Sequence, residues 1–371
     1  MKILFTAVGN EGHINPMLPL ADAFRAAGHK VAIATGPDMC PQIAERGLEA
    51  IAAGLSSMEQ RNLAGPLRAG LAPQAGMAFA METLFTRIHA PRMLPDLLLA
   101  IDAFGPDLIV HESAEFAAPL AGTLRDVPFV HHGYGVLRPP ELQRRATVSM
   151  AELWREYGRD IPDRAGMFTN LYLDVCPPGL QIGDPPCPRL PLRMVAPVRS
   201  SVAVRPDRAQ VLLTFGTVFH RDVAMVADLA RKVARLPVDL VVTSGPGVDP
   251  ADFEPQPANV RVVLFMPLAD VLPTCAAVVT HGGSGTVLAT IAHGMPLVFV
   301  PQGADHFLNA ERVGAVGAGI LADVETVTER LELVLRDPGY RQEAGRLGDE
   351  MAAMPPPAFV VDQLVCWLAD R

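Results

Sequence analysis

Lysine, cysteine and aromatic residues are scarce in this chain of 371 residues. Lysine occurs only as Lys2, Lys30 and Lys232, and the formal net charge is −9, so the sequence offers no basic patch for nucleic acid or an anionic membrane. The five cysteines form no C-x-x-C pair, which fits a reduced protein better than a disulfide framework. The N-terminal apolar run is too short for a signal peptide, and no stretch is long enough to span a bilayer. We therefore expect a cytoplasmic protein.

Several motifs of nucleotide-binding and hydrolytic enzymes are also missing. No G-x-G-x-x-G follows the first strand pattern of either half, and the strand that ends at Thr35 lacks the acidic residue that binds a ribose in nicotinamide enzymes. A G-x-x-x-x-G-K-[ST] loop is absent and Ser284 does not lie in G-x-S-x-G, which argues against a P-loop enzyme and an α/β-hydrolase. No Asp-x-Asp pair is available to hold a metal ion on a diphosphate, so we expect neither a metal nor a resident cofactor.

The chain instead alternates strand and helix patterns, which indicates parallel α/β layers. Strand patterns cover 2–8, 30–35, 48–52, 108–110 and 128–131 in the first half, and 211–215, 239–243, 260–265, 276–280, 297–300 and 319–322 in the second. A proline-rich stretch without clear period, 185–207, lies between them. We predict two doubly wound, Rossmann-like domains over 1–195 and 208–355 that face each other across a crevice, with a linker at 196–207.

The most informative segment is VTHGGSGTVLATIAHGMPLVFVPQGADHFLNAER, residues 279–312. A strand pattern ends at His281, a glycine turn follows, and a helix pattern begins. This arrangement directs free backbone N–H groups and a positive helix end at one point, and glycines let a ligand approach the backbone closely. Phosphate binds well at such a point. A second strand pattern then brings Gln302, Asp305 and His306 close by, so the segment predicts a diphosphate site with sugar-facing polar groups.

The blocks HGGSGT, GMPLVFVPQGAD and LNAERV, in this order, resemble the donor-binding signature of GT-B glycosyltransferases, specifically the family 1 enzymes that modify microbial natural products. The resemblance covers essentially the whole chain. It implies an inverting transfer of a sugar from a dTDP or UDP donor to a hydroxyl of an apolar aglycone. It also implies a C-terminal helix, 356–371, that packs on the first domain. We expect a deoxysugar, with glucose as the alternative.

On the acceptor side, the resemblance implies that His13 is the general base that takes the proton of the acceptor hydroxyl. Imidazole titrates near neutral pH, which suits this role. The alternative is that His13 only packs the first turn, where Asn15 and Pro16 suit the N-cap and the first position of a helix.

A carboxylate that orients the histidine is expected beside it. Glu112 lies at the position where the family has an acidic partner. Glu115 is its rival and could instead cap the following helix, whereas Asp107 precedes the strand and belongs to its opposite end.

On the donor side, the resemblance implies that His281 donates to the α-phosphate. Backbone or hydroxyl bonds to the diphosphate are expected from Gly283, Ser284, Gly285 and Thr286. Thr217 resembles a second phosphate contact and could equally cap a helix. The nucleobase is expected beside the segment Phe265, Met266 and Pro267.

Asp305 and His306 occupy the positions that contact sugar hydroxyls in the family. Many relatives have Asp-Gln there, so His306 departs from the pattern and leaves the identity of the sugar open. Gln302 is expected near the donor or in support of its loop.

Acceptor specificity is expected from two less regular excursions, 55–100 and 138–154. The first contains Met77, Met81 and Phe85, which suit an adaptable apolar surface. Their helical spacing fits a role in the core equally well.

Two other functions stay open at this point. A sugar-nucleotide epimerase of the same fold would use carboxylates on the sugar itself, and a non-catalytic helper protein would only bind the nucleotide sugar. His13 and Glu112 together argue against the helper. A monomer and a homodimer are equally compatible with the sequence.

Overall fold

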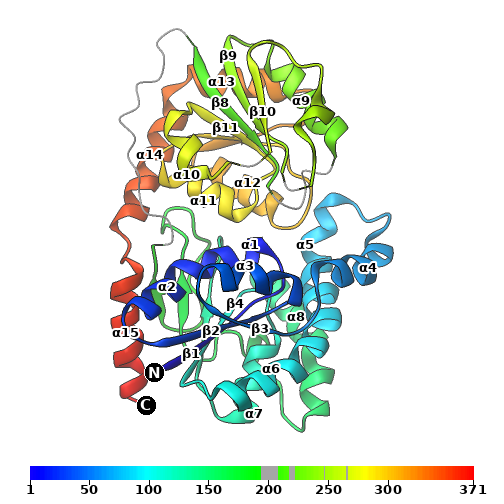
Figure 1. Cartoon of the computed structure of the whole chain (residues 1–371). Coiled ribbons are helices and arrows are strands. Elements are labelled where there is room, and N and C mark those ends of the chain that lie inside the picture. The colour runs from blue at the N-terminus through cyan, green and yellow to red at the C-terminus, as the bar shows by residue number, and fades with distance from the viewer. Residues whose placement is uncertain (194–207, 217–221, 246, 265) are drawn as a thin grey trace. The chain divides into compact units, whose positions relative to one another are not determined.

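The computed structural model describes residues 1–193, 208–216, 222–245, 247–264 and 266–371 (Figure 1). The chain divides into two compact units. The first contains Met1–Cys176, Ile182–Met194 and Pro355–Arg371, and the second contains Pro177–Gln181 and Val195–Met354. The linker predicted at 196–207 lies outside the described residues.

The first unit is built on a parallel sheet of seven strands in the order β3-β2-β1-β4-β5-β6-β7. The strands are β1 Lys2–Thr6, β2 Lys30–Thr35, β3 Glu49–Ala52, β4 Leu108–Glu112, β5 Phe129–His132, β6 Tyr172–Asp174 and β7 Arg189–Pro191. The order runs outward from β1 in one direction and from β4 in the other, as in a doubly wound fold.

Helices connect these strands. They are α1 Glu11–Ile14, α2 Leu18–Ala26, α3 Cys40–Glu45, α4 Ser57–Arg68, α5 Gly76–Phe79, α6 Ala90–Phe104, α7 Ala117–Arg125, α8 Pro140–Glu156 and α15 Pro357–Ala369, with a π-helix at Ala80–His89. The C-terminal helix α15 belongs to this unit and packs against α2 (Figure 1).

The second unit has a parallel sheet of six strands in the order β10-β9-β8-β11-β12-β13. Its strands are β8 Ala209–Thr214, β9 Val238–Thr243, β10 Val260–Val263, β11 Ala277–Thr280, β12 Leu297–Phe299 and β13 Gly319–Leu321. Its helices are α9 Val223–Val233, α10 Leu268–Val271, α11 Ser284–Ala292, α12 His306–Ala315, α13 Val327–Arg336 and α14 Pro338–Ala353.

Both faces of the central strands β8, β11 and β12 of the second sheet are largely buried, which is why these strands are almost continuously apolar in sequence. Successive side chains of a strand point to opposite faces. Val211, Leu213 and Phe215 accordingly contribute to one hydrophobic cluster, and Leu212 contributes to another. Burial on both faces from Val211 to Thr214 fixes the register of β8 between β9 and β11.

Three sequence expectations require correction. The proline-rich stretch 185–207, which shows no clear period in sequence, contains a strand that was not predicted, because β7 pairs with β6 at its start; an edge strand of three residues tolerates prolines and leaves no periodic signal. Residues 177–181 belong to the second unit, since Arg312 donates to the carbonyls of Leu180 and Gln181. The excursions 55–100 and 138–154 are largely helical, and α4 begins with a Ser56–Glu59 capping box.

Among the described residues, no single helix is long and apolar enough to cross a membrane, and only α14 and α15 taken together would pass that test.

Candidate functional site

The candidate site residues of the two units lie at equivalent points of their sheets. In the first unit, β1 and β4 are neighbours whose chains wind away in opposite directions, and in the second unit β8 and β11 are the corresponding pair. Ligands of doubly wound folds bind beyond the carboxyl ends of such a strand pair. His13 and Glu112 lie at this point in the first unit, and His281 with its glycine turn lies there in the second.

In the first unit, His13 and Glu112 meet directly. His13 Nδ1 lies 3.2 Å from Glu112 Oε1, and the histidine side chain is 15% exposed whereas the glutamate is completely buried. A carboxylate at this distance holds the imidazole ring in orientation and stabilises its protonated form.

His13 reaches this position from inside α1, and the predicted helix start at Asn15 was wrong. The N-cap is Asn10, whose side chain accepts a hydrogen bond of 3.0 Å from the backbone N–H of Gly12. Asn15 already has helical angles and continues with Pro16 into a short 3-10 turn before α2. Asparagine is a strong N-cap residue at both positions, and the bond to Gly12 decides between them.

Glu112 is held in its ionised form despite its burial. Burial alone would raise its pKa, but the charge and hydrogen bonding of His13, together with the backbone N–H groups of Ala114 and Val8, lower it. The N–H of Ala114 donates to Oε2 at 2.6 Å and that of Val8 to Oε1 at 3.2 Å. A carboxylate with three such partners stays charged across the neutral pH range.

Glu115, the rival carboxylate, has a different role. Its two oxygens accept hydrogen bonds from the N–H groups of Ala117 and Ala118 at 2.7 and 3.0 Å, so it caps the start of α7. Burial, and then the nearby charge of Glu112, raise the pKa of Glu115 to about 8. Asp107 lies at the opposite end of the sheet, where it accepts from the N–H of Lys2 at 2.7 Å.

The other histidines near Glu112 are buried and neutral. Burial lowers the pKa of both His89 and His132 to about 4. Their side chains are completely enclosed, unlike that of His13. Of the histidines around Glu112 that the structure describes, His13 is therefore the one whose side chain is partly exposed.

Aromatic rings pack around His13. The rings of Phe85 and Tyr134 stand edge-on to it, with centroid distances of 5.5 and 5.3 Å. Phe85 and Met81 are both buried on the π-helix, and Met81 also lines a pocket next to this group. Met77, the third residue predicted for the acceptor, is half-buried on α5 and is not among the residues that line this pocket.

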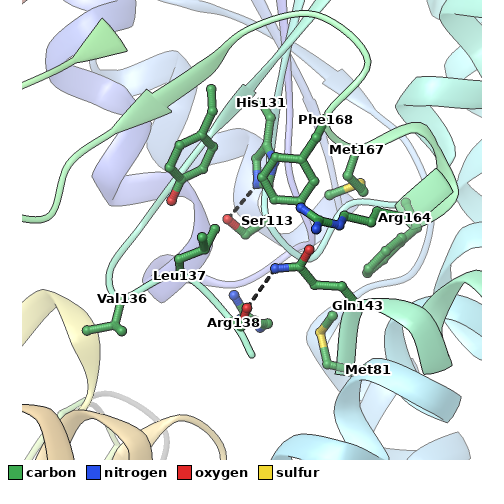
Figure 2. Close-up of a pocket in the computed structure, with 12 residues that line it drawn as sticks. Met81, Ser113, His131, Val136, Leu137, Arg138, Gln143, Arg164, Met167 and Phe168 are labelled. Carbon is green, nitrogen blue, oxygen red and sulfur yellow. Dashed lines mark hydrogen bonds between the residues drawn. The ribbon is translucent and has the colours of Figure 1, made fainter. Parts of the chain in front are cut away.

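The pocket lies in the first unit (Figure 2). Its lining comprises Met81, Ser113, Phe116, His131, Val136, Leu137, Arg138, Gln143, Arg164, Met167, Phe168 and Tyr172. Ser113 Oγ and His131 Nε2 are hydrogen-bonded at 2.8 Å, and Gln143 donates to the carbonyl of Arg138 at 2.6 Å. Sequence reasoning missed this pocket, because its residues come from segments that only the tertiary structure brings together.

In the second unit, His281 is buried at the end of β11 with Thr280 Oγ1 3.3 Å from its Nδ1. Two glycines make room for its ring. A Cβ at Gly216 would stand 2.9 Å from its Cε1, and a Cβ at Gly283 would stand 2.7 Å from its Nε2. At these two positions a glycine is needed because a side chain would collide with the ring of His281. The sequence had suggested a different reason for the glycines of the turn, which is that they let a ligand approach the backbone.

Helix α11 begins at Ser284 directly after the turn. Its N-cap, Gly283, has no side chain to cap the first N–H groups. Gly285 is exposed, and a Cβ there would meet open space, whereas Thr286 is buried. The helix therefore presents uncapped N–H groups and the positive end of its dipole to whatever binds above the turn.

The hydroxyl of Ser284 is already engaged. It donates to Asp305 Oδ2 at 2.6 Å, and Asn309 donates to the same carboxylate oxygen and to Ser284 Oγ, both at 3.1 Å. Asn309 also donates to the carbonyl of Gly282 at 2.8 Å. Sequence reasoning missed Asn309, although an amide four residues after Asp305 on the buried face of α12 is a readable signal.

His306 is buried and packs edge-on against His281, with 4.4 Å between ring centroids. The N–H of Gln302 donates to His306 Nδ1 at 3.2 Å, and the side chain of Gln302 donates to the carbonyl of Val300 at 3.1 Å. Gln302 thus supports its own loop in this structure. Sugar contacts of Asp305 and His306 stay predictions.

The segment predicted for the nucleobase is described only in part. Met266 is half-buried against the cluster that contains Leu212 and Val271, and Pro267 is exposed as the N-cap of α10. Phe265 and Thr217 lie outside the described residues. In the part of the chain that the structure describes, no group of three or more His, Cys, Asp or Glu side chains is arranged to hold a metal ion.

The comparison with known proteins shows to which family the chain belongs. The domain models of the erythromycin biosynthesis protein CIII-like family match residues 22–216 with the N-terminal domain and 227–367 with the C-terminal domain. The L-demethylnoviosyl transferase of Streptomyces niveus is 36% identical over 98% of this chain and 97% of its own length. The aclacinomycin-T 2-deoxy-L-fucose transferase of Streptomyces galilaeus is 30% identical over 98% and 95%. The crystal structure of the glycosyltransferase VinC in complex with dTDP has a TM-score of 0.79 at 26% identity and covers 100% of both chains.

Proposed function

We propose a specific reaction for this chain, which belongs to the erythromycin biosynthesis protein CIII-like family and is a glycosyltransferase of the GT-B fold. The reaction is the inverting transfer of a deoxysugar from a dTDP donor to a hydroxyl of an apolar natural-product aglycone. The contact of 3.2 Å between His13 and Glu112 carries the proposal, because it equips the first unit with an oriented base.

The donor assignment has two supports. A relative is named for the transfer of 2-deoxy-L-fucose, and a structural neighbour was crystallised with dTDP. In this chain, the uncapped start of α11 and the side chain of His281 converge at the end of β11, as a diphosphate requires. UDP is the alternative nucleotide.

In the proposed mechanism, the side chain of His13 removes the proton of the acceptor hydroxyl as its oxygen attacks the anomeric carbon. Glu112 stabilises the imidazolium that forms. Negative charge grows on the departing diphosphate, where His281 and the N–H groups of α11 are positioned to stabilise it. Attack from the face opposite the leaving group inverts the configuration, and the proposed sequence uses no metal ion.

The acceptor is proposed to bind beside His13, where Phe85, Tyr134 and the pocket around Met81 provide apolar surface. The epimerase and helper alternatives gain no support from the relatives, which are named as transferases. Neither alternative would need a base oriented towards an acceptor hydroxyl.

The first test is thermal unfolding of the whole protein with dTDP, UDP, ADP and NAD. A ligand present at 100 times its Kd adds about 2.7 kcal/mol to the free energy of unfolding. We expect dTDP to raise the Tm, UDP to raise it less, and NAD to leave it unchanged. Protection by none of the nucleotides would contradict the donor assignment.

The second test separates transferase from epimerase. The protein is incubated with a dTDP-deoxysugar, with and without a panel of aromatic and polyketide alcohols, and free dTDP is measured. We expect dTDP release only when an acceptor is present, together with a glycosylated product of inverted configuration. Loss of donor without an acceptor would contradict the proposal.

A further inference from the structure

The start of α12 holds the glycine turn of the second unit. Asn309 donates hydrogen bonds to the carbonyl of Gly282 at 2.8 Å and to Ser284 Oγ at 3.1 Å. Asp305, the N-cap residue of α12, accepts a hydrogen bond of 2.6 Å from the hydroxyl of Ser284. A Cβ at Gly282 would lie 3.2 Å from the carbonyl oxygen of His306, so the backbone of the turn also lies close to the helix. These contacts make the start of α12 the support of the turn.

His306 belongs to the same support and contacts His281, the first residue of the turn. The two rings stand edge to face, with 4.4 Å between their centroids. The ring of Phe215 is stacked on that of His281 at 5.9 Å, and a Cβ at Gly216 or Gly283 would collide with the same imidazole. His281 is therefore confined by its neighbours, and the ring of His306 is one wall of this enclosure. Loss of that wall would leave a void into which His281 can change its rotamer.

The ring of His306 is itself fixed by the loop before α12. The backbone N–H of Gln302 donates to His306 Nδ1 at 3.2 Å, and the backbone N–H of His306 donates to the carbonyl of Gly303 at 3.1 Å. A ring nitrogen that accepts a hydrogen bond carries no proton, so the other nitrogen, Nε2, carries the ring proton. The loop thus determines both the orientation and the tautomer of His306.

The resemblance suggested a different role for His306, a contact with the hydroxyls of the transferred sugar. Such a contact needs a polar group that reaches the ligand, and many relatives have a flexible glutamine at this position. His306 is only 2% exposed, its Nδ1 is occupied by the N–H of Gln302, and its ring lies against His281. These contacts favour support of His281 over contact with the sugar.

We propose that His306 is a positioning residue, whose ring holds the imidazole of His281 in the orientation that binds the diphosphate, and that it does not contact the transferred sugar. The inference rests on the proposed function, since it takes His281 as a ligand of the donor diphosphate. A residue that acts through His281 affects every ligand that carries the diphosphate, with or without a sugar. A residue that contacts the sugar affects only ligands that carry one.

Two ligands separate these roles in calorimetric titrations of the whole protein. dTDP carries the diphosphate without a sugar, and dTDP-glucose carries both. In His306→Asn, the side-chain oxygen can still accept from the N–H of Gln302, but the ring that packs against His281 is lost. We expect this variant to bind both ligands about 5- to 10-fold more weakly, by the same factor, because a displaced His281 loses a charge-assisted hydrogen bond to phosphate.

A second background tests whether the effect passes through His281. In His281→Ala the ring that His306 supports is absent, so the further change His306→Asn should alter the affinity for dTDP less than about twofold. A general disturbance of α12 would weaken dTDP binding in both backgrounds. The double-mutant cycle therefore separates positioning of His281 from a merely structural role of His306.

Two further variants serve as controls, and thermal unfolding of each shows that it is folded before titration. His306→Phe retains a ring and loses the acceptor for Gln302; it should bind dTDP within about threefold of the unmodified protein, and it tests the role of the ring even where His306→Asn is too unstable to titrate. His293→Asn changes a histidine at the opposite end of α11, where Nδ1 lies 2.8 Å from the carbonyl of Ala289. It should leave both affinities unchanged.

A normal affinity of His306→Asn for dTDP would overturn the inference. A loss confined to dTDP-glucose would also overturn it, because that result assigns His306 to the sugar. An undiminished effect in the His281→Ala background, or a loss in His306→Phe as large as in His306→Asn, would do the same. All of these outcomes leave the donor assignment intact, whereas absence of dTDP binding to the unmodified protein would reject that assignment and the inference with it.

Discussion

Gly283 lies against the ring of His281 so closely that a Cβ at this position would stand 2.7 Å from Nε2 and 3.3 Å from Cε1. The backbone of Gly283 has φ −62°, which any residue can adopt. The requirement for glycine at this point of the turn therefore comes from space beside the imidazole and not from backbone conformation.

Gly283→Ala should displace the His281 ring and weaken dTDP binding by about tenfold, since one charge-assisted hydrogen bond is worth roughly 1.5–3 kcal/mol. Calorimetric titration with dTDP measures the effect. Gly345→Ala on α14 is the matched control, because a Cβ there meets nothing within 4 Å. It should leave dTDP binding unchanged and stabilise the helix by about 0.5–1 kcal/mol. Equal affinities of the two variants for dTDP would contradict the prediction.

His13→Ala should lower turnover by roughly 10²–10⁴-fold, the usual contribution of a general base. Donor binding should change little, because His13 and the HGGSGT turn lie in different units. Steady-state rates with an acceptor from the screen, together with dTDP titration, measure both quantities. His29→Ala in the same unit is the control and should retain normal turnover. A rate for His13→Ala equal to that of this control would remove His13 from the mechanism.

Glu115 should make the protein less stable as the pH rises through neutrality. Its carboxyl ionises near 4.5 in the unfolded chain and near 8 when folded, so between these values the folded state holds a proton that the unfolded state has released. Stability then falls by up to about 1.4 kcal/mol per pH unit between roughly pH 5 and 8.

Glu115→Gln should remove this slope, which urea unfolding at pH 5.5, 6.5 and 7.5 will reveal. Glu141→Gln is the control, because hydrogen bonds from Arg144 and Arg145 lower the pKa of Glu141 and both states are ionised throughout this range. Identical pH slopes for the unmodified protein and Glu115→Gln would show that Glu115 is already ionised at neutral pH.

Asn309→Ala should destabilise the second unit by about 1–3 kcal/mol and weaken dTDP binding, because it leaves Ser284, Asp305 and the carbonyl of Gly282 without their shared donor. Unfolding and dTDP titration are measured on the same preparation. Asn259→Ala is the matched control, since that side chain donates to the carbonyls of Ala234 and Val238 away from the turn. It should lose stability but keep its affinity for dTDP. A normal affinity in Asn309→Ala would mean that Asn309 only stabilises the fold.

Much of the fold could be predicted from the sequence because the central strands of both sheets are buried on both faces. Strands such as β1, β8 and β11 are continuous apolar runs between turn residues, and each was predicted to within two or three residues at its ends. The strands β6 and β7 were missed, because strands of three residues are too short to carry a periodic pattern. The edge strand β7 also lies in a stretch whose prolines suggest a linker.

The sequence by itself determined that His13, Glu112 and the HGGSGT turn lie at or beyond the ends of parallel strands, and the carboxyl ends of parallel strands lie at one edge of a sheet. Tertiary structure alone decided which of these side chains meet within each unit. It placed Glu112 beside His13 and turned Glu115 into the cap of α7, a choice that depends on which backbone N–H groups each carboxylate meets. It also brought Arg138 and Arg164 to one pocket. Side chains from separate loops meet only through packing, and local sequence does not encode that distance.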